Sequence, residues 1–198
     1  GPIGCEMALA HRRLGSAVTV IERGTMLSKD EPELVDVVRQ RLLAEGITIR
    51  EGIGVEAVEP AANGAVRLTL SDGTTVSGSH LLVATGRQAT VDGLGLEAAE
   101  ILLERGAIRT DSGMRTTNPR VFAVGDVAGG PQFTHAAGYQ AGIVLKRALF
   151  HLPAKADHGL IPWATYTDPE LAHVGLTEAQ AHEKLGDVVR VLTWQMAE

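Results

Sequence analysis

A glycine-rich turn opens directly into a helix at the start of the chain, and this feature restricts the fold more than any other. The turn spans Gly1 to Glu6, and after the helix an apolar strand ends in Glu22. Glycine lets the pyrophosphate of a cofactor approach the backbone, while a helix N-terminus offers free N–H groups and the positive end of its dipole. The pattern is typical of a βαβ dinucleotide-binding unit.

A second nucleotide-type signal follows about 120 residues later. The apolar run Val121–Val124 ends in Gly125-Asp126 and predicts a strand that delivers a carboxylate to a sheet edge, where open α/β sheets bind ligands. A turn-forming aspartate is the alternative, and we favour the ligand site. A helix predicted from Gln132 to about Phe150 would direct its N-terminal amides to the same place. Two such signals suggest an oxidoreductase with two cofactors.

Composition restricts the class of protein further. The 198 residues are 44% apolar and 21% charged, as in an ordinary soluble globular protein, and the net charge of −6 argues against nucleic acid as a partner. No apolar run approaches the roughly 20 residues of a membrane span, so we expect no membrane association. The single cysteine excludes an intrachain disulfide and favours a cytoplasmic location.

The order of predicted elements gives an α/β fold. Helices are expected over residues 2–14 and 30–46, the second with a capping box begun by Asp30. Buried strands are expected over residues 18–21, 47–53 and 81–84, with an antiparallel meander of short strands before the last. The sequence therefore predicts a Rossmann-like domain with a meander. From Ile161 a new unit begins, with a capped helix at Thr177.

Three side chains near the first turn have competing interpretations. Glu22 lies where an acid accepts hydrogen bonds from the adenine ribose hydroxyls, and we favour this over a solvated charge at a strand end. Its charge would repel a 2′-phosphate, so NAD is preferred, although the neighbouring Arg23 leaves NADP open. Glu6 either interacts favourably with the helix dipole or reaches the nicotinamide half of the cofactor. Cys5 is interpreted as a small buried apolar residue.

The seven histidines predict no metal site, because their spacing matches no set of metal ligands. His135 could act as a general base. A packed or capping role is the interpretation that we prefer.

Five ordered motifs resemble those of the flavin-dependent pyridine nucleotide-disulfide oxidoreductases, and most closely the dihydrolipoamide dehydrogenase and mercuric reductase branch. The motifs are Gly1-Pro2-Ile3-Gly4-Cys5-Glu6-Met7-Ala8, Val18–Glu22, Ala84–Arg87, Thr117–Asp126 and Tyr166–Glu170. The resemblance runs along the whole chain, and five motifs in order are far more specific than one.

The resemblance implies cofactors and site residues. For NAD, it implies a site lined by Gly1, Pro2, Ile3, Gly4, Glu6, Glu22, Val55 and Gly86. For FAD, it implies that Asp126 bonds the ribityl chain and that Gln132, Phe133, Thr134 and His135 contact the edge of the flavin ring.

The resemblance also implies three domains and a homodimer. Residues 1–87 would form the NAD-binding domain, and residues 88–156 the second segment of a split FAD-binding domain. Residues 157–198 would begin the dimerisation domain, which would be incomplete here.

Two departures from the family pattern affect the prediction. The family's first FAD motif and its Cys-x4-Cys belong before residue 1, and its catalytic His-x4-Glu pair belongs beyond residue 198. We therefore expect a fragment that holds no catalytic residue and is inactive by itself. The family's Pro-Asn pair is replaced by Ala89-Thr90, which alters the local loop.

The expected reaction is hydride transfer between NAD(H) and FAD, followed by electron exchange with a disulfide or thiol-type substrate or a metal ion. One alternative is a stand-alone dinucleotide-binding module without catalysis. Another is a relative without an active disulfide that oxidises NADH with oxygen or quinone.

Overall fold

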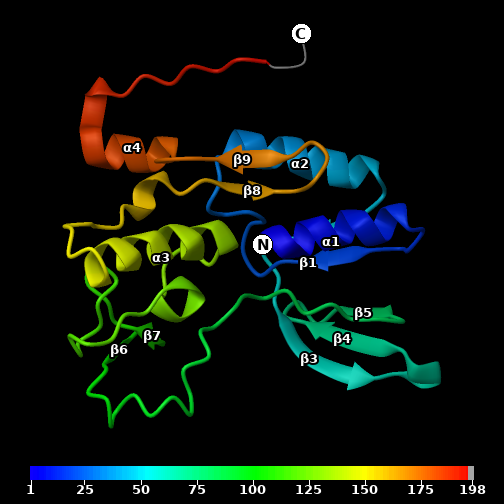
Figure 1. Cartoon of the computed structure of the whole chain (residues 1–198). Helices are drawn as coiled ribbons and strands as arrows, with labels where there is room; N and C mark the ends of the chain where they lie inside the picture. Colours follow the sequence, from blue (N-terminus) through cyan, green and yellow to red (C-terminus); the bar gives the residue numbers. More distant parts are fainter. Residues whose placement is uncertain (196–198) are drawn as a thin grey trace. The chain divides into compact units, whose positions relative to one another are not determined.

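The computed structural model describes residues 1–195 and divides the chain into two compact units (Figure 1). The first unit contains Gly1–Gly86 together with the chain from Ala164 onward. The second unit is Arg87–Trp163. Each is described by itself.

Two helices of the first unit begin at prolines and end before glycines. Helix α1 covers Pro2–Arg13 with Gly1 at its N-cap, and helix α2 covers Pro32–Ala44. Gly15 and Gly46 follow them with φ of 98° and 85°, a conformation that glycine adopts at little cost. Both predicted helices are therefore confirmed.

The predicted capping box of the second helix is wrong. Glu31 occupies the N-cap of α2 and its side chain makes no capping hydrogen bond. Asp30 lies one residue too early, and its side chain is buried.

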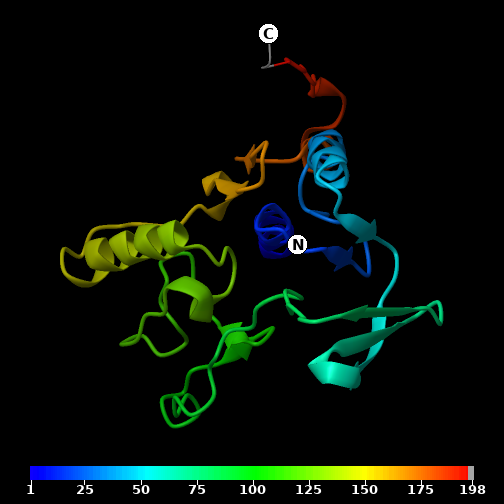
Figure 2. The same cartoon turned by 90° about the vertical axis from the view of Figure 1, so that its right-hand side faces the viewer.

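The strands of this unit form two small sheets. Strands β1 (Thr19–Ile21) and β2 (Thr48–Arg50) pair in parallel. Strands β3 (Val55–Pro60), β4 (Val66–Leu70) and β5 (Thr75–Gly78) form an antiparallel sheet in that order, drawn as a twisted ribbon in Figure 2. The meander is confirmed.

The strand predicted over residues 81–84 is not formed. Leu82 and Val83 are 54% and 70% exposed, and among the described residues β1 pairs only with β2. A parallel strand is stable only when neighbouring strands take up its backbone hydrogen bonds. The apolar run alone therefore does not build a strand here.

The core of the first unit joins segments far apart in sequence. Strands β8 (Trp163–Thr165) and β9 (Leu171–His173) are antiparallel, and β9 lies against α2 in both views (Figures 1 and 2). Helix α4 (Glu178–Leu185) has Thr177 at its N-cap, with the expected capping. The buried core comprises Cys5, Ala8, Leu9, Met26, Leu27, Val35, Val38, Leu42, Ile47 and Leu171.

The second unit contains one long helix and little sheet. A hairpin joins β6 (Leu103–Glu104) to β7 (Ala107–Ile108), and helix α3 covers Thr134–Ala148. The strand predicted over Val121–Val124 is wrong, since only a single bridge joins Phe122 to Arg115. Helix α3 is two residues shorter at each end than predicted.

Short 3₁₀ turns connect these elements, at Ala62–Gly64, Gly125–Ala128, His158–Leu160 and Gly186–Val188. Over residues 1–195, no helix combines the length and the apolar character that crossing a membrane requires.

Candidate functional site

The first turn of α1 leaves its backbone accessible. Gly1 at the N-cap carries no side chain that could cap the helix, and Pro2 follows it as the first helical residue. Ile3 is 49% exposed. Free N–H groups at a helix start bind anions well, so this turn suits a pyrophosphate.

Gly4 packs against Ala84. A Cβ on Gly4 would lie 3.7 Å from the Cβ of Ala84, which is an ordinary van der Waals contact. Close approach of the helix therefore does not by itself require glycine at this position.

Glu22 lies beside the start of α1. Its Oε1 accepts a hydrogen bond from the backbone N–H of Gly24 at 2.9 Å, and its Oε2 lies 3.5 Å from the amino nitrogen of Gly1. The backbone of Glu22 is bonded to Arg50 and Ile53, which continues the β1–β2 pairing. The structure thus places the Glu22 carboxylate beside Gly1.

Two other predicted NAD-site residues belong to the same unit. Val55 begins β3 two residues after Ile53, the backbone partner of Glu22, and its side chain is 45% exposed. Gly86 follows Ala84 by two residues and has φ of 131°, a region that favours glycine.

Glu6 and Cys5 occupy different environments on the same helix turn. The Oε1 of Glu6 accepts a hydrogen bond from the backbone N–H of Tyr166 at 2.9 Å, a contact that neither sequence interpretation of Glu6 included. Cys5 is 1% exposed, and burial raises the pKa of its thiol. Cys5 is therefore the buried apolar residue that the sequence predicted.

An ion-pair network anchors the loop before β9 to the two helices. The guanidinium of Arg13 bonds the carboxylates of Glu45 and Asp168, and Arg41 lies within 3.1 Å and 3.6 Å of the same two groups. The hydrogen bond from Arg13 is the main reason that the pKa values of both carboxyls are lowered.

The turn that carries Asp126 is held at both ends by side chains that sequence reasoning missed. The N–H of Gly125 donates to the Oε1 of Gln140 at 2.6 Å. At the other end, Arg87 donates to the backbone carbonyl of Gln132, and its Nη1 lies 3.7 Å from the Oδ2 of Asp126. No local pattern could have revealed these partners, which are 15 to 45 residues away.

The four residues predicted at the flavin edge lie around the start of α3. Gln132 and Phe133 precede the helix, while Thr134 begins it without a side-chain cap. The rings of Phe133 and His135 stack with centroids 5.2 Å apart. The Nε2 of His135 lies 2.7 Å from the carbonyl of Pro162, so it carries the proton and donates it to this acceptor. His135 is exposed, and its Nε2 is engaged as a donor rather than free to act as a base.

The glycines on either side of Asp126 determine the backbone shape of this turn and how its carboxylate is presented to a cofactor. Gly125 and Gly129 have φ of 74° and 72°, and a Cβ on either would come within 3.2 Å of an alanine Cβ. Asp126 itself is half-exposed at 50%. A tight glycine turn that presents an accessible carboxylate fits a hydroxyl-rich chain such as the ribityl group of FAD.

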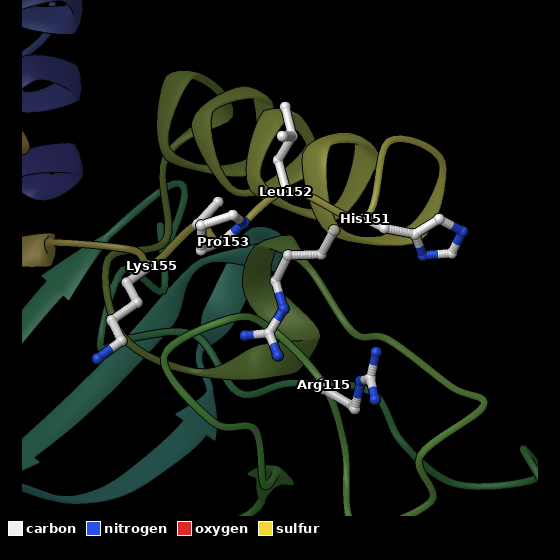
Figure 3. Close-up of a pocket in the computed structure, with 7 residues that line it drawn as sticks. Arg115, His151, Leu152, Pro153 and Lys155 are labelled. Atoms are coloured by element: carbon white, nitrogen blue, oxygen red, sulfur yellow. The ribbon is translucent and has the colours of Figure 1, made fainter.

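A cavity of about 650 Å³ lies elsewhere in the second unit (Figure 3). Its lining is basic and includes Arg115, Arg147, His151 and Lys155, with Arg147 lying 3.7 Å from Asp111. None of the predicted cofactor-site residues lines it. Within the described part of the chain, no three His, Cys, Asp or Glu side chains are grouped to hold a metal ion.

Comparison with known proteins gives matches along nearly the whole chain. The family profile described as pyridine nucleotide-disulphide oxidoreductase matches residues 1–141. The profile of its dimerisation domain matches residues 161–198. A mercuric reductase from Streptomyces lividans is 39% identical over 186 residues, covering 92% of this chain. A dihydrolipoyl dehydrogenase from Chlorobaculum tepidum is 37% identical over 185 residues, covering 91%.

Solved structures show the same relationship. The HOCl-induced flavoprotein disulfide reductase RclA from Escherichia coli, as its Cu(II) complex, is similar with a TM-score of 0.85 and 30% identity over 92% of this chain. LpdA from Mycobacterium tuberculosis gives a TM-score of 0.86 at 28% identity over 93% of the chain. The chain spans 39% of each curated relative named above, and 43% and 40% of these two structures. With matching motifs, fold and family profiles, the chain belongs to the pyridine nucleotide-disulphide oxidoreductase family.

Proposed function

We propose that this chain is part of a longer flavoprotein oxidoreductase. The enzyme would transfer hydride between NAD(H) and FAD and exchange electrons with a disulfide or thiol-type substrate or a metal ion. The observation that carries the proposal is the Gly125-Asp126 turn, which presents a half-exposed carboxylate on a backbone that only glycine fits well. The named relatives include both mercuric reductases and dihydrolipoyl dehydrogenases, so the final substrate is left at this chemical class.

The proposed NAD site consists of Gly1, Pro2, Ile3, Gly4, Glu6, Glu22, Val55 and Gly86. Its support is the uncapped start of α1 with Glu22 beside it. The amides of the first turn would bind the pyrophosphate, and Glu22 would accept hydrogen bonds from the ribose hydroxyls. The Glu22 carboxylate would disfavour the extra phosphate of NADP.

The proposed FAD contacts are Asp126 to the ribityl hydroxyls and Gln132, Phe133, Thr134 and His135 at the ring edge. When bound, FAD supplies the two-electron acceptor chemistry of the reaction. This chain's own residues would hold the ribityl chain through Asp126 and cover the ring edge with Phe133. The uncapped amides at the start of α3 would favour the negative charge that a reduced flavin ring gains.

The proposed domain division is residues 1–87 for NAD, 88–156 for FAD and 157–198 for dimerisation. The match of the dimerisation-domain profile to residues 161–198 supports a homodimer of the intact protein. The cytoplasmic location expected from the cysteine content stays a prediction, which cell fractionation would check.

The test is to purify the full-length gene product and record its visible spectrum before and after anaerobic addition of NADH. A bound flavin that NADH bleaches, followed by reoxidation with a disulfide or Hg(II), is the expected result. Bleaching that only oxygen or quinone reverses would favour the NADH oxidase alternative. A protein that binds NADH but never carries flavin would overturn the proposal in favour of a binding module.

A further inference from the structure

Gln140 is a fully buried polar side chain on the inner face of α3. It is 0% exposed and makes two side-chain hydrogen bonds. Its Oε1 accepts the N–H of Gly125 at 2.6 Å, and its Nε2 lies 3.1 Å from the Nε2 of His158. Burying a side-chain amide without hydrogen-bond partners costs free energy, so both hydrogen bonds stabilise Gln140 in its buried position.

The partners fix the orientation of the Gln140 amide. Because a backbone N–H can only donate, the atom facing Gly125 must be the oxygen. The NH₂ group then faces His158, whose Nε2 must accept, which places the ring proton on Nδ1. The ring of His158 also lies close to Gly130, since a Cβ on that glycine would approach its Nδ1 to 3.9 Å. Gln140 thus bonds Gly125 at one end of the Asp126 turn, and His158 lies near Gly130 at the other end.

We propose that Gln140 is a positioning residue that holds the Gly125-Asp126 turn in the shape that binds the flavin. This inference rests on the function proposed above. Gly125 is buried and has no side chain of its own, so the Gln140 bond is what ties its N–H to α3. Asp126 is the next residue, and any rotation of the Gly125 peptide moves its carboxylate. His158 is exposed, so it supports Gln140 but does not replace it.

The position of the bond explains why a polar residue stands in a packed helix face. Ala136 and Ile143 are also buried on α3, and an apolar residue would fill the space of Gln140 without any need for partners. The Asp126 turn requires a hydrogen-bond acceptor at this position, because the N–H of Gly125 would otherwise be buried without one. Arg87 holds the far end of the same segment through the carbonyl of Gln132.

The experiment uses the full-length gene product and three variants. Gln140→Met keeps the length of the side chain and removes both hydrogen bonds. Gln140→Glu keeps an acceptor for Gly125, and His158 can donate to its second oxygen from the other tautomer. Tyr139→Phe is the matched control, because it removes the neighbouring bond from Asp157 N–H to the Tyr139 hydroxyl and leaves Gly125 bonded.

Two quantities are measured: the dissociation constant of FAD and the hydrogen exchange rate of the Gly125 amide in FAD-free protein. We expect Gln140→Met to weaken FAD binding about tenfold or more and to speed exchange at Gly125 by a similar factor, as an unsatisfied buried amide would. Gln140→Glu should bind FAD more tightly than Gln140→Met, because it restores an acceptor to Gly125 although its buried charge is costly, and Tyr139→Phe should change neither quantity. Exchange of the α1 amides serves as the internal reference for general unfolding.

The outcomes separate this inference from the proposed function. If the original protein carries FAD and Gln140→Met binds it equally well, the positioning role is overturned while the function stands. Faster exchange at Gly125 and in α1 alike would also overturn it, since the effect would then be general destabilisation. If the original protein carries no FAD, the proposed function fails, and the Gly125 exchange rates still decide whether Gln140 holds the turn.

Discussion

The carboxylate of Glu6 accepts a hydrogen bond from the backbone N–H of Tyr166, although the two residues are 160 positions apart. Glu6 lies in the first turns of α1, next to the proposed NAD-binding backbone. Tyr166 lies in the loop between β8 and β9, which the dimerisation-domain profile covers. The bond links the start of the dinucleotide turn to the segment expected to form the dimer interface.

Removing the Glu6 carboxylate should loosen this link. In Glu6→Ala, the N–H of Tyr166 loses its acceptor, so we expect its hydrogen exchange to accelerate about fivefold or more. Glu6→Gln keeps an acceptor oxygen and should leave the rate close to the original. Equal exchange in all three proteins would show that the bond does not form in solution.

The glycine of the Asp126 turn should tolerate no side chain. In Gly125→Ala, a Cβ would have to sit at φ of 74° and 3.2 Å from the Cβ of Ala137, which costs about 1–2 kcal/mol from backbone strain alone. We expect weaker FAD binding, measured by fluorescence titration. The control is Gly138→Ala on α3, where a Cβ meets nothing within 4 Å and should stabilise the helix by about 0.5–1 kcal/mol. Comparable FAD affinity in both variants would contradict the role of the turn.

The charge of Glu22 should determine cofactor preference. Glu22→Gln keeps the shape and removes the negative charge, so we expect weaker NADH binding, stronger NADPH binding and a preference reduced about tenfold. The ratio of kcat/KM values for the two cofactors measures this. Glu59→Gln, an exposed change on β3, is the control and should leave the ratio unchanged. An unaltered ratio in Glu22→Gln would place the adenine ribose elsewhere.

The partly buried ion pair between Glu51 and Arg39 should make the free energy of unfolding depend on pH. Glu51 accepts hydrogen bonds from Arg39 and from the backbone N–H of Met26, and the Arg39 bond is the main cause that lowers the pKa of its carboxyl. A lowered pKa in the folded state stabilises the protein above the ordinary glutamate pKa of about 4.3, and this contribution is lost as the pH falls below it.

The measurement compares the original protein with Glu51→Gln by urea denaturation from neutral pH to about pH 3. The difference in unfolding free energy should be largest at neutral pH and should shrink in acid. Glu56→Gln, exposed on β3, should show no such trend. A difference that grows in acid would mean that the pKa shift has the opposite sign.

The helices were predictable because local residues determine where they begin and end. Proline at the first position and glycine after the last account for α1 and α2, and the Thr177–Gln180 pair accounts for α4. The strands over 81–84 and 121–124 were wrong for a physical reason. An apolar run indicates that a segment can be buried. A strand also needs backbone hydrogen bonds to a neighbouring strand, and whether such a neighbour is present depends on the rest of the fold.

The candidate site was likewise predictable only where its signals are local in the sequence. The sequence placed Glu22 at the glycine turn and singled out Asp126, because glycine patterns and strand-end acids are local signals. It could not identify Arg87 or Gln140, whose importance lies in which distant backbone groups they contact. It also left the partner of Glu6 undecided, since Tyr166 approaches it only in the folded chain.

Burial of Cys5 has a practical consequence for labelling experiments on the full-length protein. A thiol that is 1% exposed and has a raised pKa presents little thiolate to an alkylating or aromatic disulfide reagent under native conditions. Cys5 should therefore react only after denaturation. Any thiol that is modified rapidly in the native full-length protein can then be assigned to residues outside this chain, without first mutating Cys5.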